Sequence, residues 1–262
     1  MPPDESRHEC PAAGDSADPL KARVLSAGED EILALLAAGE LDESHLALLL
    51  DRVDISAKVV TAISAFPAAA ASEGLRYRIA RHAHAPRRIA LSLLRHLFLF
   101  DLVRISLLPA VPAEIRRAAE EILITRVPNL PVGQKLTLAR RGPSRVAGAL
   151  LAEGNPQAIK LALDNAFLSE SQVLKVLAKP GVPSRVVAAI AQHKRWCVQY
   201  NVRAALVRNV HTPVPSLLTF LPNVTLRDLK DIAALETISA HTKNYIRKEL
   251  SRRSGRGEAG DS

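Results

Sequence analysis

The chain has 262 residues, of which 48% are hydrophobic but only 3% are aromatic. Its apolar residues are mainly Leu, Ala, Val and Ile, a mixture that favours short, closely packed helices over a β-sandwich. The formal net charge of +8 indicates a polyanionic partner, although charged helix faces that only keep a repeat protein soluble give the same balance.

The cysteines and the N-terminus favour a soluble protein of the cytoplasm. Cys10 and Cys197 lie far apart in the sequence, so we expect no disulfide framework and a reducing compartment. The N-terminus lacks the apolar run of a secretory signal. The most apolar stretch, residues 97–111, is too short to cross a membrane and is interrupted by Asp101 and Arg104. We therefore expect no membrane insertion.

Three regions follow one another along the chain. Residues 1–22 lack apolar periodicity and are rich in Pro, Ala, Gly, Ser and acidic residues, which predicts a disordered tail. Residues 23–252 carry apolar residues at helical spacing nearly throughout, without hairpin dipeptides or sustained alternation. Residues 253–262 predict a second, basic tail. The sequence thus predicts one all-α domain between two disordered tails.

The chain also repeats itself, because residues 76–123 align with residues 203–250 without a gap. The matched pairs include Arg81 with Arg208, His84 with His211, Pro86 with Pro213, Leu91 with Leu218 and Leu94 with Leu221. A short helical unit cannot bury its own apolar stripe, so repeated units stack and share a core. The repeat predicts a right-handed α-solenoid of short antiparallel helices, with Leu91 and Leu218 in its core.

The repeated segments resemble a known class of proteins. Residues 76–96 and 201–250 are similar to the HEAT-like repeats of bacterial solenoids. Residues 205–213 resemble the leucine-rich-repeat-variant unit more narrowly, with Asn209 and Thr212-Pro213 at the junction and Val210 where that family often has Pro. The resemblance implies a fold and no particular activity. Some members hold an iron–sulfur centre, but two distant cysteines do not supply four thiolates, so we expect no cofactor.

Metal and catalytic motifs are not found in the sequence. His82 and His84 are two residues apart and would face different directions on a helix, with no Cys or carboxylate at ligand spacing. We expect no metal site, and we expect His84 and His211 to cap neighbouring helix ends. No nucleophile elbow, phosphate-binding loop or dinucleotide fingerprint occurs. The sequence therefore predicts a non-enzymatic protein without catalytic residues.

Trp196 bears on one enzymatic alternative. Some HEAT-like solenoids are DNA glycosylases, which need aromatic side chains and a carboxylate in a basic groove. Trp196 is the only tryptophan, Tyr200 follows one turn later, and no acidic residue lies nearby. We expect Trp196 to be a core side chain or an anchor between repeats, and a DNA-repair type of enzyme is the third functional hypothesis.

The distribution of basic residues is the feature of the sequence that bears most directly on function. Residues 171–227 contain no acidic residue, and residues 76–96 repeat that pattern. Equivalent positions of a solenoid line up along one face, which predicts a positive stripe. The predicted stripe consists of Arg81, Arg140, Arg141, Lys194, Arg195 and Arg208. The leading hypothesis is a binding or scaffold protein that takes an acidic or extended protein segment; the alternative is phosphate-driven, sequence-nonspecific binding of nucleic acid.

Overall fold

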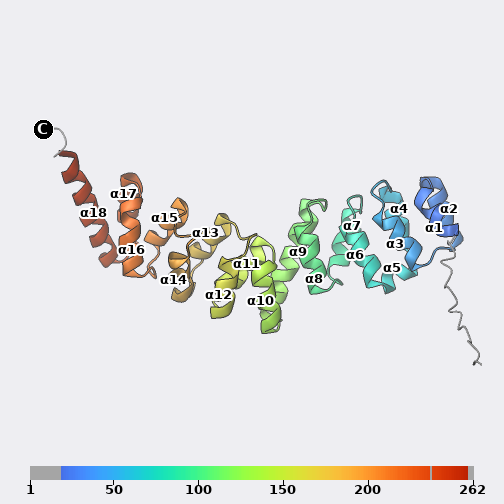
Figure 1. Cartoon of the computed structure of the whole chain (residues 1–262), viewed down its shortest axis with the longest axis horizontal. Helices are drawn as coiled ribbons and strands as arrows, with labels where there is room; N and C mark the ends of the chain where they lie inside the picture. The colour runs from blue at the N-terminus through green and yellow to red at the C-terminus, as the bar shows by residue number, and fades with distance from the viewer. Residues whose placement is uncertain (1–18, 237, 259–262) are drawn as a thin grey trace, which may run out of the picture. The chain divides into compact units, whose positions relative to one another are not determined.

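The computed structural model describes residues 19–236 and 238–258, which form α-helices and two short 3-10 helices without any strand (Figure 1). The prediction of an all-α protein is confirmed for these residues. The chain divides into two compact units, where the sequence predicted a single domain. Unit 1 takes its described residues from 1–98 and 108–115, and unit 2 takes its described residues from 99–107 and 116–262.

Unit 1 consists of short helices that pack on helices one to three places further along the chain. Its helices are α1 (Pro19–Ser26), α2 (Glu29–Ala38), α3 (Glu43–Asp51), α4 (Ala57–Ser64), α5 (Pro67–Ala71), α6 (Glu73–Arg81) and α7 (Arg87–Leu94). Helix α1 contacts α3, α2 contacts α4, and α3 contacts α6. Leu46, Leu49 and Ile63 are fully buried between them, because their spacing places them on one face of each helix.

Side-chain caps explain where several of these helices begin. The Asp42 carboxylate accepts a hydrogen bond from the His45 backbone N–H at 2.9 Å and opens α3. Ser56 and Ser72 accept in the same way at the starts of α4 and α6. Each cap satisfies an N–H group that has no partner within its own helix. Short helices are therefore defined locally at their first turn.

Unit 2 contains two interleaved rows of helices. Its elements are α8 (Leu99–Leu107), most of α9 (Ala113–Arg126), η1 (Val127–Asn129), α10 (Val132–Arg141), α11 (Ser144–Glu153), α12 (Pro156–Leu163), α13 (Glu170–Ala178), α14 (Ser184–Gln192), α15 (Tyr200–Arg208), α16 (Val214–Phe220), η2 (Leu221–Asn223), α17 (Leu226–Ala234) and α18 (Ala240–Glu258). In one row α10 contacts α12 and α12 contacts α14. In the other row α11 contacts α13, α13 contacts α15, and α15 contacts α17. The two rows share the core between them.

The internal repeat is visible as a repeat of helices. Helix α15 occupies the positions that align with α6, and α17 occupies those that align with α8. The turns after α6 and α15 also match. The backbone N–H of His84 donates to the ring of His82, and that of His211 donates to the side chain of Asn209. The alignment of residues 76–123 with 203–250 therefore reflects equivalent local structure.

The prediction that Leu91 and Leu218 lie in the core is wrong. Leu218 is 46% exposed and Leu91 is only half-buried, whereas Leu94 and Leu221 are fully buried. Leu221 lies four residues after the buried Leu217, one helical turn further along, and Leu218 is turned away from that face. The alignment paired equivalent positions correctly but did not show which face of the helix is buried.

The difference between Leu218 and Leu221 gives a direct test of the core. We expect Leu221→Ala to lower the free energy of unfolding by about 2–5 kcal/mol, because it leaves a cavity. The matched control Leu218→Ala is expected to change it by less than about 1 kcal/mol, as exposed substitutions usually do. Urea denaturation followed by circular dichroism measures both. Equal losses for the two variants would show that the burial of this helix is misassigned.

The boundaries of both predicted tails differ from the structure. Helix α1 begins at Pro19, inside the segment 1–22, and α18 continues to Glu258, inside the segment 253–262. Disorder of the remaining residues lies outside the described part of the chain. The composition of the last helix is polar, so its sequence resembles a tail, but a tertiary contact holds it.

Arg253 makes that contact. Its guanidinium donates hydrogen bonds to the backbone oxygens of Val224 at 2.8 Å and of Leu221. Glu249 accepts hydrogen bonds from Arg252 and Arg253, and these lower the pKa of Glu249 to about 2. Arg253 thus joins α18 to the backbone at η2, beside the packing of α18 on α17 and the buried Ile246, and extends the folded chain beyond the predicted boundary.

Candidate functional site

Hydrogen bonds between successive helix junctions define one edge of unit 2, which we call the Asn165 edge. Asn165, after α12, is buried, and its Nδ2 donates to the backbone oxygens of Ala139 at 2.9 Å and Gly142 at 3.0 Å, at the end of α10. Arg195, after α14, donates in turn to the backbone oxygens of Asn165 and Leu168, both at 3.0 Å. The junctions that follow α10, α12 and α14 therefore lie side by side.

Trp196 belongs to the same edge. It is 2% exposed, and its Nε1 donates to the backbone oxygen of Leu163 at 2.9 Å. The Arg195 guanidinium lies over the indole ring, with 4.3 Å between Cζ and the ring centroid. The prediction that Trp196 is a core side chain is confirmed. Its indole N–H is engaged within the fold.

The opposite edge of unit 2, which we call the Asn209 edge, is defined by the junctions after α13 and α15. Asn209, after α15, donates from Nδ2 to the backbone oxygen of Leu177 near the end of α13, at 3.2 Å. Helix α13 begins at the Asn165 edge, where Ser144 and Ser169 are hydrogen-bonded. Its nine residues span about 13 Å, so the two edges lie one helix length apart.

Two of the six predicted stripe residues have internal roles. Arg195 satisfies carbonyl groups at a helix end, a common use of basic side chains, so its charge is part of the fold. Arg81 lies in unit 1 and forms an ion pair with Asp51, which Arg78 also contacts. Arg81 is paired with a carboxylate, and the Arg195 guanidinium is engaged by two carbonyl oxygens and the Trp196 ring.

The other four are exposed, as Arg195 also is, but are divided between the two edges of unit 2. Arg140 and Arg141 end α10, and Lys194 follows α14, so these three lie at the Asn165 edge. Arg208 ends α15 and lies at the Asn209 edge. The helices of one row run in the opposite direction to those of the other row. Junctions of similar sequence therefore lie at opposite edges of unit 2 when their helices belong to different rows. The single stripe predicted from the sequence is therefore replaced by two separate groups.

The junction histidines also differ from the prediction. In unit 1, His82 and not His84 makes the capping contact, from Nε2 to the backbone oxygen of Arg52 at 3.0 Å. In unit 2 the equivalent contact comes from Asn209 and not from His211. In both turns the contact to the end of an earlier helix comes from the residue two positions before the predicted histidine, His82 or Asn209. His84 and His211 themselves are exposed.

The Asn209 edge contains a cavity of about 410 Å³ with basic walls. Its polar side chains come from Lys179 at the end of α13, Arg208 at the end of α15, and Asn209 and His211 in the following turn. Its other lining residues are Ala178, Pro180, Gly181, Val182 and Val210. None of the described residues that line this cavity is acidic.

A second cavity adjoins the first through Lys179 and lies over α11 and α13. It has a volume of about 270 Å³ and is also lined by Lys175 and Arg145. Arg145 forms ion pairs with Glu120 and Glu121, and burial of Glu120 raises the pKa of its carboxyl group. We call Lys175, Lys179, Arg208 and His211 the basic groove; Arg145 is excluded because its charge is already paired.

The cations of the basic groove have a local reason for their position. Lys175 and Arg208 lie in the last turns of α13 and α15, where a positive charge interacts favourably with the helix dipole. Their ends nevertheless reach solvent. Within the described part of the chain, Lys175, Lys179 and Arg208 form no ion pair, and all three are exposed. Their charged ends are available to an anionic group from outside, and Arg208 also lies near enough to Asp228 to contribute to the lowered pKa of that carboxyl group.

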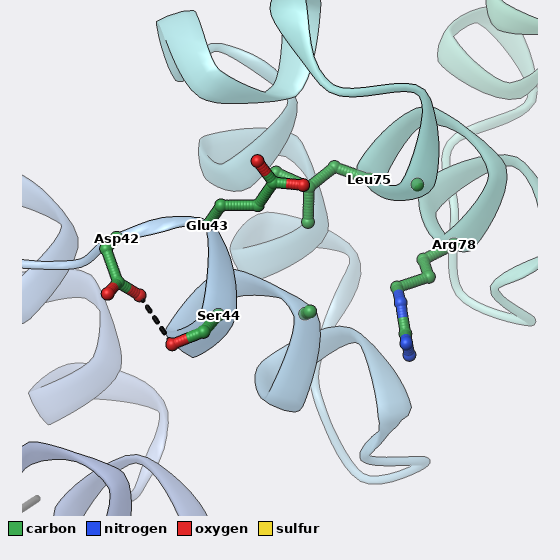
Figure 2. Close-up of a pocket in the computed structure, with 7 residues that line it drawn as sticks. Asp42, Glu43, Ser44, Leu75 and Arg78 are labelled. Atoms are coloured by element: carbon green, nitrogen blue, oxygen red, sulfur yellow. Dashed lines mark hydrogen bonds between the residues drawn. The ribbon is translucent and has the colours of Figure 1, made fainter.

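The cavity of about 550 Å³ in unit 1 has a different character (Figure 2). Its lining includes Asp42, Ser44 and Arg78. The Ser44 hydroxyl donates to Asp42, whose carboxylate also caps α3, and hydrogen bonds from the His45 backbone and from Ser44 lower the pKa of Asp42. Arg78 is paired with Asp51. These groups are occupied in holding the fold, so the basic groove of unit 2 is the stronger candidate.

Three further observations bear on function. Within residues 19–236 and 238–258, no group of three or more His, Cys, Asp or Glu side chains is placed to hold a metal ion. No helix in that part of the chain combines the length and the hydropathy needed to cross a bilayer. Comparison with protein-family models, curated proteins and solved structures found no match to this chain.

Proposed function

We propose that this protein is a non-enzymatic binding or scaffold protein, a right-handed α-solenoid of HEAT-like or leucine-rich-repeat-variant type. The two rows of unit 2 support this architecture, with α10, α12 and α14 in one row and α11, α13, α15 and α17 in the other, as do the hydrogen bonds that connect successive junctions through Asn165, Arg195 and Asn209. In this proposal the chain acts in the cytoplasm and uses no cofactor; Cys197 forms no disulfide within the described residues.

The partner that we propose is an acidic or extended protein segment held in the basic groove. The observation that carries this proposal is the cavity at the Asn209 edge. Lys179, Arg208 and His211 converge on it, and no acidic side chain lines it among the described residues. Complementary charge in such a site speeds association and orients a partner, while the apolar walls contribute contact area.

Nucleic acid is the second candidate, because the same cations bind phosphates. Sequence-tolerant binding of single strands uses aromatic side chains on which bases stack. Trp196, the only tryptophan, is buried at the other edge of unit 2 with its N–H engaged. No Phe, Tyr or Trp lines either cavity of the groove among the described residues. These observations favour a protein partner and give the hypothesis of a DNA-repair enzyme the weakest support.

Charge reversal at the two edges tests the proposal. We expect K179E/R208E to weaken binding of fluorescent poly-glutamate by at least about tenfold, measured by anisotropy at moderate salt. The control R140E/R141E makes the same change of charge in the last turn of α10, at the Asn165 edge, and is expected to bind within about twofold of wild type. K179Q/R208Q provides a second variant in case the reversed charges disturb the helix ends.

Two results would overturn this assignment. Equal weakening by K179E/R208E and R140E/R141E would show that overall charge, and not the basic groove, determines binding. Tighter binding of a short duplex DNA than of poly-glutamate, with a steep loss as salt increases, would assign the groove to nucleic acid. Circular dichroism and thermal melting of each variant confirm that the fold is intact, which we expect because exposed charges contribute little to stability.

A further inference from the structure

An exposed row of aliphatic side chains begins at the basic groove. Val210 lines the cavity beside Arg208 and is 56% exposed. Val214 and Leu218 follow it on α16 and are 40% and 46% exposed. We call Val210, Val214 and Leu218 the aliphatic row. It brings apolar surface to the same edge of unit 2 that carries the unpaired cations.

The position of α16 explains why the row and the groove are continuous. This helix starts directly after the turn at the Asn209 edge and therefore leads away from the cavity. Val214 and Leu218 are four residues apart and lie on one face of the helix. Leu217 and Phe220 are buried on the adjoining side and hold α16 in the fold. The core therefore leaves the side chains of Val214 and Leu218 exposed.

Exposed aliphatic side chains that cluster beside a charged site are informative about the partner. Removing apolar surface from water on binding contributes a favourable free energy in proportion to its area. Grouped exposed apolar residues therefore mark interaction sites. Phosphate groups gain nothing from valine or leucine. A protein segment that has both carboxylates and aliphatic side chains satisfies the cations and the row together.

We propose that the basic groove and the aliphatic row together bind an acidic amphipathic helix. Its carboxylates face Lys179 and Arg208, and its aliphatic face packs on Val214 and Leu218. The one-turn spacing of these two side chains matches the spacing of anchors on a partner helix, as in other helix-in-groove complexes. This inference rests on the proposed function and specifies the partner of the same site.

Two synthetic peptides separate the contributions of charge and apolar contact. Both are helical and carry the same number of Glu residues; one has Leu at the positions of a helical stripe, and the other has Ala at those positions. We expect wild-type protein to bind the Leu peptide about tenfold more tightly than the Ala peptide, measured by anisotropy. K179E/R208E is expected to weaken binding of both peptides.

Variants of the aliphatic row complete the test. V214S/L218S is expected to remove the preference for the Leu peptide and to weaken binding of the Ala peptide much less, because alanine buries less apolar surface on the row. The control V198S/L226S alters two side chains of similar exposure, 60% and 46%, at the Asn165 edge, where Tyr200 contacts Thr225. We expect this control to keep the preference. Thermal melting verifies that each variant is folded.

The possible failures are distinguishable. If wild type binds the two peptides equally while K179E/R208E still weakens both, the proposal of an amphipathic helix is wrong but the basic groove remains a binding site. If V198S/L226S removes the preference as V214S/L218S does, the apolar contact is not specific to the aliphatic row, and the inference fails. If K179E/R208E has no effect on either peptide, the proposed function itself is wrong.

Discussion

Replacing Trp196 by alanine is expected to lower the free energy of unfolding by about 3–5 kcal/mol, the range found for large aromatic side chains in protein cores. Trp196 is 2% exposed and lies in the turn between α14 and α15. The substitution leaves a cavity, removes the hydrogen bond to the backbone oxygen of Leu163, and takes the ring away from beneath Arg195. All three losses fall on the contact between successive junctions.

Phenylalanine at the same position separates packing from hydrogen bonding. Trp196→Phe keeps an aromatic ring but loses the N–H, so the oxygen of Leu163 loses this donor, and we expect a smaller loss of about 1–3 kcal/mol. Urea denaturation followed by far-ultraviolet circular dichroism measures both variants. A loss below about 1 kcal/mol for Trp196→Ala would mean that this side chain does not anchor the junctions, contrary to its burial.

The sequence was sufficient for the helical fold, the internal repeat and the burial of Trp196. These features depend on local signals or on a unique residue. Apolar spacing predicts helices because one face of each must be buried, and the gap-free alignment of residues 76–123 with 203–250 predicts equivalent helices such as α6 and α15. Trp196, the only tryptophan, was expected to be buried, and it is.

The direction in which basic side chains point was not predictable from the sequence. Lys194 and Arg195 are neighbours, yet only Arg195 reaches the carbonyl groups of the preceding junction. Arg140 and Arg208 both end a helix with similar sequence, but α10 and α15 belong to different rows and end at opposite edges. These differences depend on how helices stack, which is a tertiary property.

The basic groove had a partial signal in the sequence. The acid-free stretch 171–227 includes Lys175, Lys179, Arg208 and His211, so a positive surface in this region was expected. Their convergence was not expected, because it requires α13 and α15 to end side by side, which the contact from Asn209 to Leu177 establishes. Apolar matching alone likewise did not show that Leu218 is exposed.

Replacing Asn165 by aspartate is expected to cost about 3–5 kcal/mol of unfolding free energy at neutral pH, because it buries a charge without a partner. Asn165 is 1% exposed, and its Nδ2 donates to the backbone oxygens of Ala139 and Gly142. A carboxylate oxygen in that position would face two carbonyl oxygens. The remaining oxygen still accepts a hydrogen bond from the backbone N–H of Phe167, so the loss falls on the contact with the end of α10.

The pH dependence identifies the cause of this loss. Burial and the facing carbonyls raise the pKa of the introduced carboxyl above its unfolded value, so the folded variant takes up a proton more readily than the unfolded chain. The penalty is therefore full above the raised pKa and shrinks as pH falls toward the usual range of aspartate. Comparing Asn165→Asp with wild type at each pH, by urea denaturation, isolates this effect from the titration of other groups.

Asn209 supplies the matched control, because it bonds in the same pattern with less burial. Its Nδ2 donates to the oxygen of Leu177 and its Oδ1 accepts from the N–H of His211, but the side chain is only half-buried. Solvent reduces the cost of a charge there, so we expect Asn209→Asp to lose about 1–2 kcal/mol with a weaker dependence on pH. Equal losses for the two variants would show that burial does not distinguish the two edges of unit 2.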